Sequence, residues 1–269
     1  MRRVGHWEAL PQSDRTERRR QIAAGRAGQD LTSAQRRFWE RFWGSGTIGP
    51  LLQANTLELL TEIAEMARSL HPHVAVDVGC GEGRNLAFLR SISSVRRILA
   101  LDISHSALDR ACSAVRGAGA GAQVDLICAN CMQMPLGQGV ADLLLASDLL
   151  NHILSWADAI GEFARILRPG GVLICNPLSV NDPAYRSVEG CGQVVGPRAF
   201  LVCPPQGAQS GSGYIMKFAE RLEVEEILAN RFRTVFPVEE CERVDPPHGP
   251  PFNQQEHRHV YWRVVCERV

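Results

Sequence analysis

Apolar and polar positions between residues 71 and 176 follow a pattern that predicts strands separated by helices. Apolar runs of four to seven residues are typical of strands that are buried on both faces of a parallel sheet. Between them, apolar residues recur three or four positions apart, as in an amphipathic helix. The predicted strands are Val74–Val78, Ile98–Leu101, Val124–Cys128, Val140–Ala146 and Val172–Cys175, and the predicted helices are Asn85–Ser91, Ser106–Arg116 and Ala157–Leu167.

This alternation predicts an α/β fold with a doubly wound, mostly parallel sheet, because right-handed crossovers place helices on both faces. A further helix is predicted at Ala219–Asn230. Two closing strands follow at Arg233–Val238 and His259–Cys266, joined by the proline-rich loop Asp245–Gln255. We therefore predict one domain over residues 71–269.

Two segments precede this domain. Residues 1–30 are polar and Arg-rich, which predicts a flexible arm or a solvated helix, with a basic contact for an acidic partner as the alternative. Residues 31–70 are predicted to form helices that cap the site. In them Phe38, Trp39, Phe42 and Trp43 recur at helical spacing, a stripe that favours packing over a cofactor box.

The chain is 45% hydrophobic and 22% charged, as expected for a globular protein with a sizeable core. Its net charge of zero favours neither nucleic acid nor a membrane as a partner. No apolar run reaches the roughly 18 residues that a membrane span needs, and residues 1–30 contain no secretory signal. The nine cysteines mostly lie in apolar stretches, which predicts reduced thiols and a cytoplasmic protein.

Three glycines at alternate positions, Gly79, Gly81 and Gly83, follow the first predicted strand and precede a helix. Without a Cβ atom, such a turn lets a cofactor approach the main chain closely. The second strand ends at Asp102, about 20 residues later, where a carboxylate can accept hydrogen bonds from ribose hydroxyls. These features predict a nucleotide-type cofactor at the carboxyl ends of the strands.

A nicotinamide dinucleotide is one such cofactor. Its fingerprint needs a small residue at the sixth position of the loop, where this chain has Arg84. A dinucleotide also leaves the turn Arg168–Gly171 before the fifth strand unexplained. A nicotinamide oxidoreductase is therefore the less favoured reading.

The loop Asp77–Gly83, Asp102 and the turn Leu167–Gly171, in this order and spacing, resemble the class I S-adenosylmethionine-dependent methyltransferases. The resemblance covers roughly residues 70–176. It implies S-adenosylmethionine as methyl donor and a Rossmann-like, seven-stranded sheet with an antiparallel closing strand. The predicted function is methyl transfer to O, N or S of a small-molecule acceptor.

The resemblance also implies roles for individual residues. Gly79, Cys80 and Gly81 lie under the methionine and ribose parts, Asp102 binds the ribose hydroxyls, and Asn130 stands where many relatives have Asp beside the adenine. The full set of predicted donor-binding residues is Asp77, Gly79, Cys80, Gly81, Gly83, Asn85, Asp102, Ile103, Asn130, Cys131, Met132 and Ser147.

His152 is the candidate general base, because it follows the fourth strand where acceptors dock. A structural role lining the donor is the alternative. Cys128 and Cys131 have the spacing of a zinc half-site, but no second pair matches them, so no metal is predicted. His257 and His259 share a strand face and are interpreted as a surface pair.

Residues 177–217 are rich in Pro, Gly and Ser and lack periodicity, which predicts a lid-like insertion. The stretch Asn176–Tyr185 resembles, more loosely, the tellurite-resistance-like branch of the same methyltransferases. It implies a small acceptor beneath the insertion. The predicted acceptor-binding residues are Asn176, Tyr185, Arg186 and Tyr214.

Two other functions remain open at this point. A non-catalytic S-adenosylmethionine-binding or regulatory protein has the same fold and needs no base. A nucleic-acid methyltransferase is less favoured, because Ala146–Leu149 replaces the Asn/Asp-Pro-Pro-aromatic motif of one such class. The oligomeric state is not indicated by the sequence.

Overall fold

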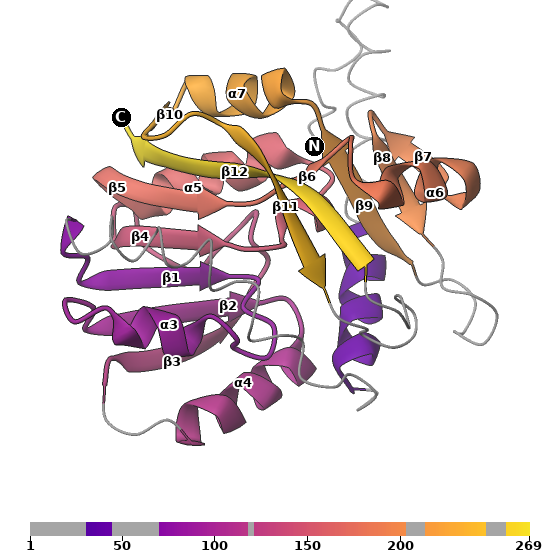
Figure 1. The fold of residues 1–269 in the computed structure, drawn as a ribbon. Helices are drawn as coiled ribbons and strands as arrows, with labels where there is room; N and C mark the ends of the chain where they lie inside the picture. The colour runs from indigo at the N-terminus through magenta and orange to yellow at the C-terminus, as the bar shows by residue number, and fades with distance from the viewer. Residues whose placement is uncertain (1–30, 45–69, 118–120, 203–212, 246–256) are drawn as a thin grey trace, which may run out of the picture.

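The computed structural model describes residues 31–44, 70–117, 121–202, 213–245 and 257–269 (Figure 1). The predicted arm 1–30 and almost all of the predicted helix Leu51–Leu70 lie outside these ranges. Within them, twelve strands form one sheet in the order β3-β2-β1-β4-β5-β12-β6-β9-β8-β7, and β10 and β11 also pair with β12.

The predicted parallel core is confirmed, and its strands occur close to the predicted positions. Central strand β1 pairs in parallel with β2 on one side and with β4 on the other. Successive strands are therefore added on one side of β1 up to β3 and on its other side from β4 onward. This switch in strand order opens a crevice at the carboxyl ends of β1 and β4. The core strands are β1 (Val74–Val78), β2 (Arg97–Asp102), β3 (Gln123–Cys128), β4 (Ala141–Ala146) and β5 (Leu167–Cys175).

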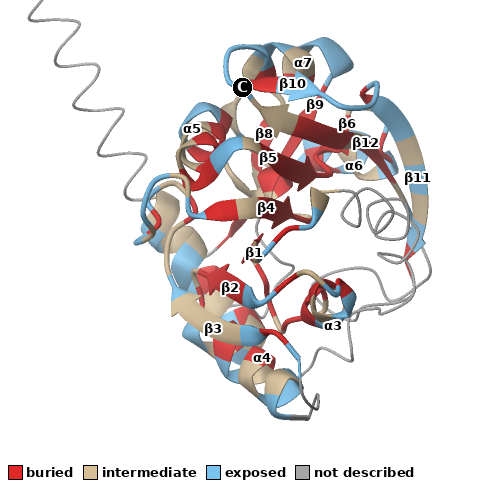
Figure 2. Cartoon of the chain, turned by 90° about the vertical axis from the view of Figure 1, so that its left-hand side faces the viewer, coloured by how far each residue is buried: buried red, intermediate tan, exposed pale blue. Residues whose placement is uncertain are grey.

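Helices cover both faces of this sheet, and Figure 2 shows the buried residues gathered between them and the strands. Apolar residues of α3 and α4 pack on one face, and those of α5 and α7 pack on the other. The apolar strands are therefore buried on both sides, as their composition predicts. The helices are α3 (Leu86–Ser91), α4 (His105–Gly117), α5 (Trp156–Ile166) and α7 (Arg221–Ala229), and a 3₁₀ turn, η2 (Leu150–His152), follows β4.

The C-terminal strands include the two that were predicted and one more. β12 (His257–Arg268) runs antiparallel to β5, and β10 (Phe232–Thr234) pairs with its end. The additional strand β11 (Glu239–Asp245) pairs with the first half of β12. β12 is longer than predicted because its first half has a partner that alternating apolar residues did not reveal.

The insertion is more regular than predicted. Its described residues form β6 (Leu178–Ser179), α6 (Pro183–Cys191), β7 (Gln193–Gly196), β8 (Ala199–Val202) and β9 (Tyr214–Ala219). They extend the sheet beyond β12, so the sheet has more than the seven strands expected. The Pro, Gly and Ser residues of this region hid strands whose stability comes from pairing with distant partners.

Residues 31–44 are helical, as predicted. Glu40 attaches this helix to the start of α4 by accepting hydrogen bonds from the hydroxyls of Ser104 and Ser106, each at 2.8 Å. Gln35 Nε2 donates to the His152 carbonyl at 2.5 Å. The helix is therefore held at two places on the carboxyl edge of the sheet.

The replacement Phe163→Ala tests the core between α5 and the sheet. Phe163 is fully buried in α5, so its loss should lower the free energy of unfolding by about 3–5 kcal/mol in urea titrations. Leu222→Ala, at an exposed position of α7, is the control and should change it by less than about 0.5 kcal/mol. Equal losses in both variants would contradict this packing.

Candidate functional site

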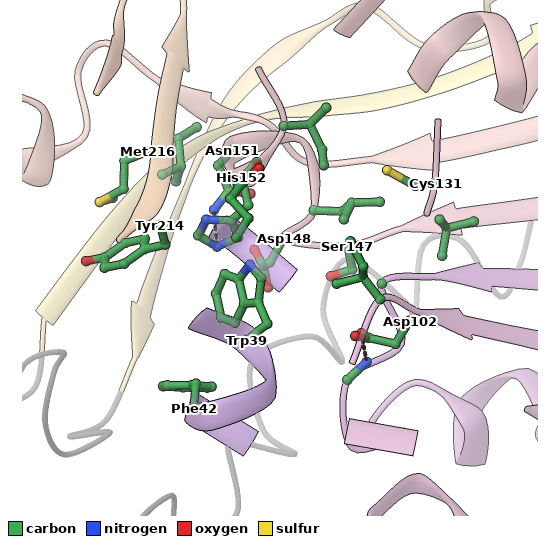
Figure 3. Close-up of a pocket in the computed structure, with 18 of the residues that line it drawn as sticks. Trp39, Phe42, Asp102, Cys131, Ser147, Asp148, Asn151, His152, Tyr214 and Met216 are labelled. Atoms are coloured by element: carbon green, nitrogen blue, oxygen red, sulfur yellow. Dashed lines mark hydrogen bonds between the residues drawn. The ribbon is translucent and has the colours of Figure 1, made fainter. Parts of the chain in front are cut away.

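A cavity of about 510 Å³ lies at the carboxyl edge of the sheet. Figure 3 shows Asp102 and Ser147 on one side of it, Tyr214 and Met216 on the other, and Asp148 and His152 between them. Its walls come from the glycine loop, the ends of β2 and β4, the helix 31–44, the insertion, and strands β11 and β12. The cavity therefore joins the predicted donor site to the predicted base.

The glycine loop has the backbone that its sequence predicts. Gly79, Gly81 and Gly83 have φ angles of 72°, 54° and 84°, in the region that favours glycine. A Cβ atom on Gly79 would come within 2.9 Å of the Leu149 side chain. The amides of Gly79 and Cys80 both donate to the Leu101 carbonyl, at 2.7 and 2.9 Å, which ties the loop to the end of β2.

Asp102 lies beside this loop at the edge of the cavity. Its Oδ2 accepts a hydrogen bond from the Gly81 amide and its Oδ1 accepts one from the Ser104 amide, both at 2.9 Å. Burial raises the pKa of the carboxyl, while the amides of Ser104 and Gly81 oppose that shift. Each oxygen keeps a further lone pair, so the fixed carboxylate can still accept from two neighbouring hydroxyls.

Asp77 is fully buried beneath the glycine loop and is not among the lining residues. Its Oδ1 receives a long contact of 3.4 Å from Asn85 Nδ2, and its Oδ2 has no hydrogen-bond partner in the described part of the chain. Burial raises the pKa of this carboxyl to about 7. Oδ2 of Asp77 is thus an unpaired acceptor under the loop, and its burial favours either protonation of the carboxyl or a neighbouring cation.

The third strand ends in a turn that contributes Asn130, Cys131 and Met132 to the cavity. Asn130 Oδ1 accepts from the Met132 amide at 3.0 Å and stabilises this turn. Burial raises the pKa of the Cys131 thiol to about 12, so it stays neutral and packs as an apolar group. Across the described residues, no group of three or more His, Cys, Asp or Glu side chains could hold a metal ion.

His152 lies in η2 and lines the cavity. Its Nδ1 is 2.8 Å from the Ile215 carbonyl of β9, and its Nε2 is 3.2 Å from Asn151 Nδ2. Since a carbonyl only accepts, Nδ1 must carry the proton and Nε2 the lone pair. Burial lowers the pKa of the ring, so the imidazole is neutral near pH 7.

An aromatic wall surrounds this imidazole. The Trp39 ring meets it edge to face with centroids 4.8 Å apart, and the Tyr214 ring lies 6.0 Å away. Phe42 and Met216 also line this part of the cavity. These side chains exclude water and present flat surfaces on which a planar molecule can pack.

A network of charges forms a further wall, and the sequence did not indicate it. Asp148, directly after β4, pairs with Arg84 of the glycine loop and, at 3.2 Å, with Arg243 of β11. Arg243 also pairs with Asp245 at 2.7 Å. Burial opposes charge on Asp148, but the guanidinium groups of Arg243 and Arg84 outweigh it and lower its pKa.

His259 corrects a prediction, because it is not part of a surface pair. It lines the cavity, and its Nδ1 lies 2.9 Å from Asp182, the N-cap residue of α6. Asp182 itself is buried and also accepts from the Val260 amide at 2.8 Å. The Asp-Pro pair at the start of α6 is a capping signal in the sequence, but nothing there indicates contact with β12.

Most predicted donor-binding residues line the cavity, as do His152 and Tyr214. The donor-binding residues that line it are Gly79, Cys80, Gly81, Asp102, Ile103, Asn130, Cys131, Met132 and Ser147, and those outside the lining are Asp77, Gly83 and Asn85.

Three predicted acceptor-binding residues do not reach the cavity. Asn176 is buried and donates from its amide to Asp148 at 2.8 Å. Tyr185 packs its ring on Phe218, 5.1 Å away, and Arg186 is exposed. The helical period of α6 explains the positions of Tyr185 and Arg186, because it turns other residues of the helix toward the cavity, namely Pro183, Ala184, Ser187 and Val188.

Comparison with known proteins identifies this architecture. Residues 76–175 match the family model described as "Methyltransferase domain". An O-methyltransferase of Aspergillus nomiae is 27% identical over 132 residues, which cover 49% of this chain and 58% of that protein. Methyltransferase GfsG of Streptomyces halstedii is 30% identical over 149 residues, which cover 54% and 52%. The chain therefore spans about half the length of the curated relatives it matches.

Solved structures agree on the fold. A methyltransferase structure from Methanosarcina mazei superimposes with a TM-score of 0.57 at 19% identity, covering 73% of this chain and 92% of that one. A protein studied for thioacetal formation in echinomycin biosynthesis gives 0.61 at 14% identity, covering 86% and 91%. Residues 76–175 thus match a methyltransferase domain, and the fold is that of the class I S-adenosylmethionine-dependent methyltransferases. No described helix is both long and apolar enough to cross a membrane.

Asp77→Asn tests the buried carboxyl. Because its folded pKa of about 7 is above the unfolded value of 3.8, the wild type loses stability as pH rises from about 4 to about 7. The variant lacks this loss. Its unfolding free energy relative to wild type should rise by roughly 2–4 kcal/mol between pH 4 and pH 8.

Urea titrations at pH 4, 6 and 8 measure this difference. Asp109→Asn, at an exposed position of α4, is the control and should follow the wild type at every pH. A constant difference between Asp77→Asn and wild type across this range would show that Asp77 is ionised throughout.

Proposed function

We propose that this protein transfers a methyl group from S-adenosylmethionine to a hydroxyl of a small, planar, aromatic acceptor. The observation that carries the proposal is the geometry of His152. Its Nδ1 is bonded to a carbonyl, and its basic Nε2 belongs to a side chain that lines the same cavity as Asp102 and the glycine loop. Several relatives are named as O-methyltransferases, which supports oxygen over nitrogen or sulfur.

The residues present fit the donor. At Gly79 and Gly81 the glycine loop offers bare main chain, and Asp102 offers two fixed carboxylate oxygens for a pair of ribose hydroxyls. Ser147 Oγ, at the cavity, is a buried oxygen without a hydrogen-bond partner among the described residues, and an ammonium group would satisfy an acceptor of this kind. Asn130, Cys131 and Met132 would flank the adenine.

The donor, when bound, supplies an electrophilic methyl group on a positively charged sulfur. The protein supplies position and a base. Trp39, Phe42, Tyr214 and Met216 hold the ring of the acceptor and keep water away from the sulfonium. His152 Nε2 would exchange its contact with Asn151 Nδ2 for the acceptor hydroxyl and take its proton, and the hydrogen bond to Ile215 would stabilise the resulting imidazolium.

His259 is the alternative base, because it lines the same cavity and has a carboxylate partner in Asp182. Its Nε2, however, lies 3.9 Å from a second carboxylate, that of Asp245. Both ring nitrogens of His259 therefore lie near carboxylates of the protein itself. We therefore assign His152 as the base and His259 as a residue of the cavity wall.

Asp102→Asn tests the donor site. The variant keeps an oxygen for only one of the two amides that Asp102 accepts from, and it loses the charge that strengthens hydrogen bonds to hydroxyls, so S-adenosylmethionine should bind at least about tenfold more weakly. Calorimetry measures this affinity, with NAD as a second ligand. Heat with NAD and none with S-adenosylmethionine would overturn the proposal in favour of an oxidoreductase.

His152→Gln tests the base. With radiolabelled donor and a panel of phenols, thiols and amines, the variant should methylate phenols about 100-fold more slowly than wild type, while donor affinity is kept. The wild-type rate should fall as pH drops through the lowered pKa of His152, since protonation removes the Nε2 lone pair. His73→Gln, at an exposed position, is the matched control and should retain the wild-type rate.

The remaining outcomes separate the alternatives. An unchanged rate in His152→Gln with a large loss in His259→Gln would make His259 the base. Donor binding without label transfer to any small molecule would favour a non-catalytic binder. Label in added DNA or RNA would favour a nucleic-acid substrate.

A further inference from the structure

Strand β9 brings the insertion into contact with the turn that carries His152. The register of β6 on β9 covers Phe218 and Ala219. Farther along β9, η2 packs beside the strand, and the carbonyl of Ile215 accepts from His152 Nδ1 at 2.8 Å. Tyr214 and Met216, on either side of Ile215, line the cavity. The same strand therefore supplies Tyr214 and Met216 to the aromatic wall around His152, and it supplies the carbonyl that holds the imidazole proton on Nδ1.

Lys217, two residues beyond Ile215, is the only lysine of the chain. It is 9% exposed. Its Nζ lies 3.3 Å from the Leu154 carbonyl and 4.4 Å from the centroid of the Trp156 ring. None of the ion pairs formed by the described residues includes it. This ammonium is therefore held by a carbonyl dipole and an aromatic face instead of by a carboxylate in contact.

Burying a cation in this way is costly, and desolvation lowers the pKa of Lys217. An apolar side chain of similar length would fill the same space without that cost, and such replacements are often neutral or stabilising. The stability of the fold therefore does not explain the lysine. Its contacts do point to a role, because both of them lie on the segment that follows His152.

Trp156 extends this contact to the other end of the same segment. Its Nε1 donates to the Leu150 carbonyl at 2.7 Å, and Leu150 is the first residue of η2. Lys217 thus touches Leu154 directly and reaches Leu150 through the indole. His152 lies between these two points, so a shift of β9 along the segment would separate Ile215 from the imidazole.

We propose that Lys217 is a positioning residue that fixes β9 against residues 150–156 and so keeps the proton of His152 on Nδ1. The cation and its two partners define one register between strand and turn, and in that register the Ile215 carbonyl faces the ring. The catalytic meaning of this tautomer rests on the proposed function, in which Nε2 is the base. The structural claim stands without it.

Lys217→Met is the direct test, read by ¹⁵N spectra of the imidazole of His152 in the full chain. The wild type should show the Nδ1–H tautomer alone. The variant should show a mixture of both tautomers, while its Tm stays within about 3 °C of wild type and S-adenosylmethionine affinity within about twofold. Lys217→Arg keeps a cation over the indole and should restore the single tautomer.

Two further variants complete the design. Arg221→Met removes an exposed cation from the neighbouring helix α7 and should leave the spectrum unchanged. Trp156→Phe removes the bond to Leu150 and weakens the aromatic contact, so it should also give mixed tautomers if Lys217→Met does not fold.

A single Nδ1–H tautomer in Lys217→Met, or in Trp156→Phe, would overturn the proposal. So would mixed tautomers in Arg221→Met. Mixed tautomers in Lys217→Met with an unchanged rate of methyl transfer would support the positioning role and remove His152 from the mechanism.

Discussion

The position of the aromatic wall relative to the predicted donor site depends on β12, because this strand pairs with both the parallel core and the insertion. Residues 264–267 pair with β5 of the core, and Tyr261 pairs with β6 of the insertion. Continuous backbone hydrogen bonding therefore fixes β6 and β9 relative to the carboxyl end of β5 (Figure 1). An insertion attached only by its two chain ends would leave Tyr214 and Met216 of the aromatic wall free to move relative to the glycine loop.

Buried charge is the second constraint on the site. Arg84, Asp148, Arg243 and Asp245 form a continuous set of ion pairs from the glycine loop to β11. Removing one member of such a set leaves its partner's charge uncompensated in a largely buried place, which is destabilising. The network thus holds the loop after β4 in one position. Asp148 itself has a φ angle of 54°, which is uncommon for a residue with a side chain.

The sequence predicted the parts of the molecule whose physics is local. Gly79 and Gly81 are required by the backbone of a single turn, and Asp102 follows directly from the end of an apolar strand. The strands of the insertion were not predicted, because β9 is stabilised by pairing with β8 and β6 rather than by its own pattern. His259 and Arg243 were missed for the same reason: their partners Asp182 and Asp148 are 77 and 95 residues away along the chain.

The central claim is that one cavity holds the donor at the glycine loop and the basic nitrogen of His152 at the acceptor. A crystal structure with S-adenosylhomocysteine tests it most directly. The ribose hydroxyls should donate hydrogen bonds to the Asp102 carboxylate. The sulfur should point toward His152 Nε2, with room for a planar acceptor between the sulfur and that nitrogen. A ligand bound away from Asp102, or a sulfur that faces away from Nε2, would contradict it.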